Sequence, residues 1–162
     1  MKKFLFSVGA IMCVALLSVC MSSCDNENEP LNAIYTVNTD MTNEVNKITS
    51  LDGNTETKAN YNSLRAEFME MVKTETWSVD INKKNQDEVL KREDQNAKKK
   101  FDEMVAKVNA FKAKLDNLDK TLVKNQFDWD FDAVVTCIRG ELSGNTTLDT
   151  KTIAIHYDGM TD

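Results

Sequence analysis

A 40-residue segment, Asn85–Lys124, limits the folds open to this chain more than any other part of it. Its apolar residues alternate three and four positions apart, which puts them on one side of a helix. Asn85 followed three residues later by Glu88 is the pattern of a capping pair at a helix start. The stripe consists of Phe101, Met104, Val108, Phe111, Leu115, Leu118 and Leu122. An apolar surface is needed to cover it.

Two partners could cover this stripe, a second copy of the helix or the rest of the same chain. The positions that flank the stripe are rich in lysine, so two parallel helices would bring like charges together instead of complementary pairs. We therefore favour packing on the chain's own sheet or on a second helix, predicted at Asn60–Thr74. Upstream, Asp94 interrupts the stripe and predicts a break or frayed first turns.

Residues 127–140, FDWDFDAVVTCIRG, alternate in the way of a strand with one face buried throughout. Odd positions carry aromatic and small apolar residues. Even positions begin with Asp128, Asp130 and Asp132 and then become apolar, which indicates a second face that is only partly exposed. Cys137 falls on the aromatic face, so we expect an inert buried thiol.

Three further stretches alternate similarly, at residues 31–37, 76–81 and 152–157. The last should pair with the 127–140 strand as an antiparallel hairpin with a long loop. Together the elements predict an α+β fold with about four mainly antiparallel strands, and one shorter and one long helix on one face. The alternative is a helical hairpin capped by a two-stranded ribbon.

The first 23 residues have the layout of a bacterial export signal. Lys2 and Lys3 precede an uncharged apolar run of 16 residues, Phe4–Val19. As a helix this run would cover about 24 Å, short of the roughly 30 Å hydrocarbon core of a bilayer. A membrane-spanning anchor is the alternative interpretation.

The sequence MSSC at residues 21–24 places small residues before Cys24 and resembles a lipobox, the cleavage and lipidation signal of bacterial lipoproteins. The match has Met21 where leucine is usual. The resemblance implies that Cys24 becomes the first residue and carries a thioether-linked diacylglycerol. Stable anchoring needs more than one acyl chain, and this group supplies two. The alternative is a plain cleaved signal in which the cysteine is a coincidence.

The residues after Cys24, DNENEP, contain Asp25, Glu27 and Glu29. This acidic run resembles the surface-export signal of lipoproteins in Bacteroidota. An Asp directly after the cysteine also resembles an inner-membrane retention signal of enteric-type bacteria, and a solvated linker is the plain alternative. We favour the outer surface, with a periplasm-facing domain as the alternative. The chain then divides into a signal peptide (1–23), an acidic tether (24–30) and one α+β domain (31–162).

Charge and cysteine content exclude several classes of function. The mature chain has 18 basic and 26 acidic residues, a net charge of −8, which disfavours nucleic-acid binding. Cys13 and Cys20 leave with the signal and Cys24 carries lipid, so Cys137 has no partner for an intramolecular disulfide. One cysteine and one histidine do not supply a structural zinc site. We expect no cofactor and a monomer.

Asp128, Asp130 and Asp132 form the one acidic constellation that could carry chemistry. Their spacing opens a helix–loop–helix calcium site, but Ala133 and Arg139 stand where that loop needs Gly and Glu. Carboxyls two apart on a strand could also straddle a sugar bond. We favour a solvated strand face that discourages edge association, with a weak calcium or ligand site as the alternative.

Three other side chains are candidates for a functional role. His156 could be a general base, but we favour a partly buried histidine with a satisfied hydrogen bond. Trp77 and Trp129 could stack on sugar rings, but both sit in apolar alternation and are expected in the core.

These observations predict a non-enzymatic binding module on a membrane-anchored lipoprotein, with a protein or a glycan as its partner. One alternative is an inhibitor or immunity-type lipoprotein, which would present a protruding acidic loop at residues 139–150. The other is a small hydrolase that uses the strand carboxylates.

Overall fold

The computed structural model describes residues 31–41, 55–118 and 127–158. Four strands and two helices follow one another in an α+β order, which confirms the predicted fold class. They are β1 (Leu31–Met41), α1 (Thr55–Met71), β2 (Thr74–Ile81), α2 (Gln86–Asp116), β3 (Asp128–Glu141) and β4 (Gly144–Asp158).

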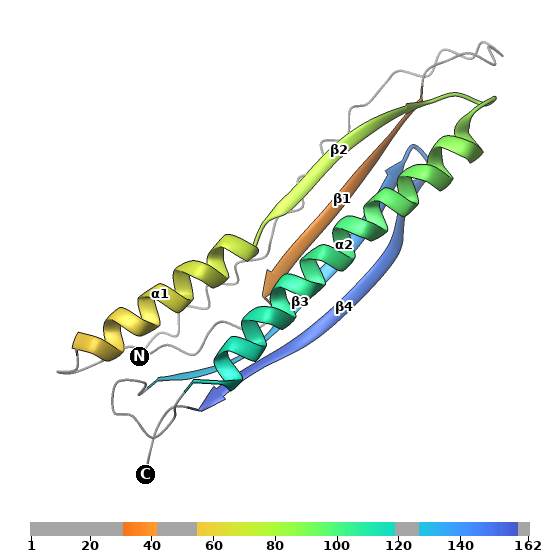
Figure 1. The fold of residues 1–162 in the computed structure, drawn as a ribbon. Helices are drawn as coiled ribbons and strands as arrows, with labels where there is room; N and C mark the ends of the chain where they lie inside the picture. The colour runs from red at the N-terminus through yellow and green to blue at the C-terminus, as the bar shows by residue number, and fades with distance from the viewer. Residues whose placement is uncertain (1–30, 42–54, 119–126, 159–162) are drawn as a thin grey trace, which may run out of the picture.

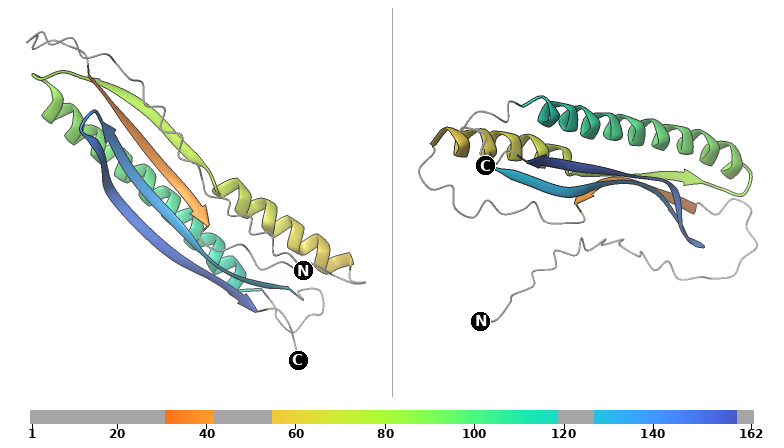
Figure 2. Two further views of the ribbon diagram at one scale, coloured as in Figure 1. Left: turned by 180° about the vertical axis from the view of Figure 1, so that it is seen from behind. Right: turned by 90° about the horizontal axis from the view of Figure 1, so that it is seen from below.

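The four strands form one antiparallel sheet in the order β2-β1-β3-β4. The register pairs Tyr35 of β1 with Trp77 of β2, and Val37 of β1 with Cys137 of β3. Strand β1 therefore lies between β2, which is near it in the sequence, and β3, which is far from it. Both helices lie on the same face of the sheet, and the opposite face carries neither of them (Figures 1 and 2). We call the helix-free side the open face.

The core lies between the sheet and the helices. Because side chains alternate across a strand, the odd-numbered residues of β1 and the first part of β3 all point toward the helices. Those at the centre, such as Tyr35, Trp129 and Cys137, are fully buried. The long stripe of α2 packs on this surface, as predicted, through buried Ala97, Phe101, Met104, Val108, Phe111 and Leu115.

Helix α1 packs beside α2 over the first half of β3. Phe68 of α1 contacts the Phe111 and Phe131 rings, with ring centroids 5.3 and 4.8 Å apart. Tyr61, about two turns earlier, meets Trp129 edge-on at 5.9 Å. These aromatic contacts join both helices to the sheet in one cluster.

The predicted break in the long helix is wrong, because α2 is unbroken through Asp94. The carboxylate at this position pairs with Arg139 of the sheet, so a polar residue is accommodated on the packed side of the helix. Asn85 is the N-cap residue, as predicted, but the expected capping bond is absent: the Asn85 side chain accepts a 2.8 Å hydrogen bond from the Asn82 amide instead. The helix ends at Asp116, and the predicted end at Lys124 lies outside the described residues.

Two other boundaries differ from the expectation. Helix α1 covers Thr55–Met71 instead of Asn60–Thr74, because Thr74 already belongs to β2, where its hydroxyl donates to Asn38 at 3.2 Å. The predicted long loop between β3 and β4 is instead a two-residue turn, Leu142–Ser143. The threonine-rich stretch after it continues the strand, as β-branched residues favour. Gly144 permits the turn with a φ of +129°.

Candidate functional site

Two members of the predicted acidic constellation, Asp130 and Asp132, lie on the open face of β3. Asp130 is exposed and Asp132 is half-buried, and both face away from the helices. Asp128 is the first residue of the strand. The hydrolase alternative required a cleft around these carboxylates, and Asp130 instead lies with 72 % of its side chain exposed on the sheet surface.

His156 lies directly across from Asp130 on β4. The imidazole Nδ1 is 3.8 Å from the Asp130 carboxylate, and 70 % of the side chain is exposed, so the expected partly buried histidine is a surface residue. The residue falls on an even position of β4, the open-face side, which explains its exposure. Within the described ranges, no group of three or more His, Cys, Asp or Glu side chains could hold a metal ion.

The two tryptophans are not exposed stacking platforms. Trp129 is fully buried in the aromatic cluster, as expected for core. Trp77 is half-buried: one side of its ring stacks on Tyr35, with centroids 5.4 Å apart, and the Lys100 ammonium lies 5.3 Å from the ring centroid. Neither indole ring has a free face of the kind that sugar stacking requires.

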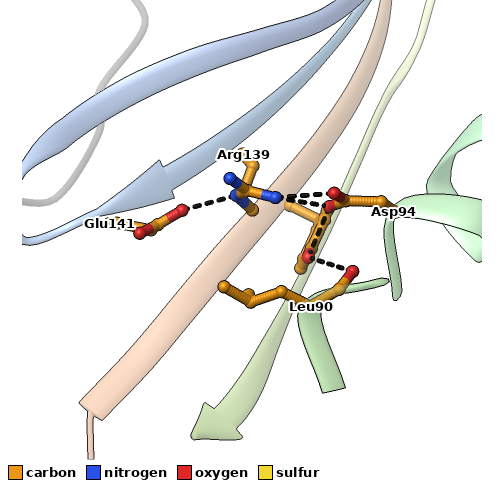
Figure 3. Close-up of polar contacts among 5 residues, drawn as sticks. Leu90, Asp94, Arg139 and Glu141 are labelled. Carbon is orange, nitrogen blue, oxygen red and sulfur yellow. Dashed lines mark hydrogen bonds and ion pairs between the residues drawn. The ribbon is translucent and has the colours of Figure 1, made fainter. Parts of the chain in front are cut away.

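A polar cluster that the sequence did not reveal joins α2 to the helix side of the sheet (Figure 3). The Asp94 carboxylate accepts hydrogen bonds from Arg139 Nη1 at 2.9 and 2.6 Å and from the Tyr35 hydroxyl at 2.9 Å. Arg139 Nε donates to Glu141 at 2.5 Å. The sequence signal for this cluster was Asp94 itself, the one charged residue in the apolar stripe.

Burial and the neighbouring carboxylates act in the same direction on the pKa of Tyr35 and in opposite directions on the pKa of Arg139. Burial raises the pKa of Tyr35 strongly, and the Asp94 carboxylate raises it further, so the phenol stays protonated. Burial alone would lower the pKa of Arg139, but the hydrogen bonds and charges of Asp94 and Glu141 outweigh it and raise the pKa. Side-chain exposure of 18 % for Arg139 and 34 % for Asp94 keeps the pair only partly desolvated. The cluster therefore fixes α2 on the sheet and offers no group ready to transfer a proton.

A shallow groove of about 410 Å³ lies between the end of α1, the start of β2 and α2. Its floor is apolar, with Met71, Met104, Ala110 and Phe111, and its rim is charged, with Glu67, Glu70, Lys73, Glu75 and Lys107. Ion pairs Glu67–Lys114 and Glu75–Lys100 join the three elements at this rim. The hydrogen bond and charge of Lys100 lower the pKa of Glu75.

Cys137 is a buried thiol, as predicted. Burial raises the pKa of the thiol to about 11, and the charges of Asp149 and Asp94 act in the same direction. A nucleophilic cysteine needs the opposite shift, because the thiolate is the reactive form. Cys137 therefore packs in the core and does not act as a nucleophile.

The lipidation residue Cys24 and the acidic export residues Asp25, Glu27 and Glu29 lie outside the described residues. In the part of the chain that the structure describes, neither helix is long and apolar enough to cross a membrane. No protein-family model matches the chain, and no curated protein or solved structure matches it either.

Proposed function

We propose that this chain is a lipoprotein anchored through Cys24 to the bacterial outer membrane, with its domain at the cell surface. The observation that supports it most is where the fold begins: β1 starts at Leu31, seven residues after Cys24. The segment before the sheet is then a signal peptide and a short acidic tether. A diacylglycerol on Cys24 would hold the sheet close to the lipid.

The domain acts as a non-enzymatic binding module for a basic partner, a protein or a glycan. Support comes from the open face, where the charged side chains among the described residues are acidic apart from His156. Asp130 and Asp132 on β3 lie on this face together with Asp40 of β1 and Asp80 of β2. With a mature net charge of −8, such a face attracts a basic surface and speeds its encounter.

Anchoring is tested by fractionation and by metabolic labelling with a palmitate analogue. We expect the wild-type chain to pellet with membranes and to carry label, and the Cys24→Ser variant to become soluble and unlabelled. Membrane association that survives Cys24→Ser would contradict anchoring at this residue. Protease treatment of whole cells tests the surface location: a domain that survives while known surface proteins are cleaved would face the periplasm.

The binding surface is tested by charge reversal. We expect Asp130→Lys with Asp132→Lys to abolish capture of a basic partner from intact envelopes, while Asp102→Lys on the outer side of α2 leaves it unchanged. Equal loss in both variants would point to net charge alone, and capture that neither variant alters would rule out this face. An enzymatic activity that disappears in Asp130→Asn would instead support the hydrolase alternative.

A further inference from the structure

One end of the elongated domain gathers the start of β1, the end of β2, the start of α2 and the turn between β3 and β4 (Figure 1). The register brings these segments together, because Leu31 pairs with Ile81 and Ile34 pairs with Gly140, two residues before the turn. We call this the turn end. The opposite end carries the last turns of α2, the start of β3 and the end of β4.

The tether can reach only a short distance compared with the length of the domain. Seven residue steps from Cys24 to Leu31 span at most about 25 Å when fully extended. Strand β3 has 14 residues and covers roughly 45 Å, and α2 with 31 residues covers about the same. A lipid on Cys24 therefore keeps the turn end near the bilayer, whereas the opposite end can stand clear of it.

The turn end also carries an apolar side chain in an unusual position. Leu142, in the two-residue turn, is 71 % exposed, and the other large exposed hydrophobic residue among the described ones, Met69, lies on α1. A leucine at a hairpin tip can enter the interfacial region of a bilayer, because burying apolar surface is favourable there.

The broad faces of the domain fit a lipid surface less well. The open face presents acidic side chains, among them Asp130 and Asp132, and an anionic membrane surface repels them. The outer side of α2 carries exposed residues of both signs, such as Lys99 and Glu103, which remain in water.

We propose that the turn end is a membrane-contact surface, with Leu142 inserted among the lipid headgroups, so that the domain stands on the bilayer and directs the opposite end outward. This inference rests on the proposed lipid anchor at Cys24. Contact at the turn end leaves the open face accessible from the side.

A fluorescent probe attached at single cysteines tests this orientation. The lipidated mature chain, in a Cys137→Ala background, is inserted into vesicles of phosphatidylethanolamine with a minority of phosphatidylglycerol. An environment-sensitive NBD dye is placed at Leu142→Cys, at Ser63→Cys on α1 and at Lys99→Cys on the outer side of α2. A lipid that carries a spin label near its headgroup serves as the quencher.

We expect several-fold stronger quenching at residue 142 than at 63 or 99, together with a blue shift of emission at 142 alone. Equal quenching at 142 and 99 would show a domain lying flat, and stronger quenching at 63 would show the reverse orientation; each would overturn the proposal. Two outcomes separate the anchor from the orientation. A wild-type chain that carries no lipid and does not bind the vesicles, as expected of Cys24→Ser, would overturn both proposals. An anchored chain with the wrong order of quenching would overturn the orientation alone.

Discussion

At the scale of single residues, Asp94 shows how a polar side chain can be placed on the packed side of a helix. The carboxylate receives hydrogen bonds from Arg139 and Tyr35, so both the charge and the phenol are satisfied. Burying a charge without such partners would cost several kcal/mol. The pairs bind three elements, α2, β1 and β3, at defined positions along their lengths.

Removal of this carboxylate should destabilise the domain. We expect Asp94→Ala to lower the free energy of unfolding by about 1–3 kcal/mol, because Arg139 and Tyr35 both lose a partner. The matched control is Asp102→Ala on the same helix, whose exposed pair with Lys98 should contribute little to the free energy of unfolding. Urea denaturation of the Cys24→Ser mature chain measures both, and equal effects would contradict a special role for Asp94.

The buried thiol predicts a loss of stability at alkaline pH. The pKa of Cys137 rises from 9.0 to about 11 on folding, so between these values the unfolded chain binds fewer protons than the folded one. The free energy of unfolding therefore falls as pH rises from 9 to 11, by up to roughly 2–3 kcal/mol. Tyr35, whose pKa is also raised, adds to this loss above its usual value near pH 10.

Denaturant titrations at pH 8 and pH 11 measure this loss. In the Cys24→Ser background, Cys137→Ala should show a smaller decrease between the two pH values than the parent, and Tyr35→Phe should do the same. A Cys137→Ala chain with the same decrease as its parent would assign the alkaline loss to other groups. At pH 8 the parent thiol should resist alkylation until denaturant unfolds the chain.

At the scale of elements, the sheet and its helices follow from periodicity. Alternation over residues 127–140 identified β3 and its buried face, and the three–four spacing of the apolar stripe identified α2 and its packing on the sheet. Each signal comes from a long run of residues that all face one core, so single exceptions did not obscure it. The order of the strands in the sheet, by contrast, depends on pairing between residues about 100 positions apart. Alternation within one strand does not indicate which other strand it pairs with.

The errors lie where a single local contact decides the structure. Asp94 predicted a break in the helix, because the sequence does not show that Arg139, 45 positions away in the chain, is its partner. A long β3–β4 loop was predicted because Gly140, Gly144 and Asn145 are common in loops, whereas here all three belong to paired strands. Of the candidate site, the alternation of Asp130 and Asp132 placed them on the correct face, but the groove between α1 and α2 could not be foreseen, since it depends on how the two helices pack.

The hairpin turn offers a direct test at this scale. Gly144 has a φ of +129°, a conformation that residues with a Cβ rarely adopt, although an added Cβ would meet no atom within 4 Å. We expect Gly144→Ala to destabilise the domain by about 1 kcal/mol or more through backbone strain alone. Ser143→Ala, in the same turn, is the control and should have little effect in thermal unfolding. Unchanged stability in Gly144→Ala would mean that the turn rearranges without cost.

At the scale of the whole molecule, the topology makes the two halves of the chain depend on each other. Strand β1 lies between β2, which follows it closely, and β3, which pairs with it from 100 residues further along at Val37 and Cys137. The aromatic cluster likewise takes Phe68 and Phe111 from the first part of the chain and Trp129 and Phe131 from the last. Neither half contains a complete core.

A truncated chain tests this dependence. We expect residues 24–118, which lack β3 and β4, to show no cooperative thermal transition and to aggregate, because β1 would have an unpaired edge and the apolar stripe of α2 would lose the half of the sheet that β3 and β4 supply. The matched control is the full mature chain with Cys24→Ser, which should unfold in one transition. A cooperative transition in the truncated chain would show that the β1–α1–β2–α2 part folds independently.

If the chain is exported and anchored at Cys24, as we propose, the central position of β1 sets an order of events. Strand β1 would leave the membrane pore first, whereas its neighbour β3 would be among the last segments to emerge. Until then, a lipid on Cys24 would hold one end of a chain whose strand β1 lacks half of its hydrogen-bond partners. Pairing between distant segments is slow, and an unpaired strand edge is prone to aggregation, so the newly anchored protein should depend on a chaperone for the interval between the arrival of Leu31 and that of Asp158.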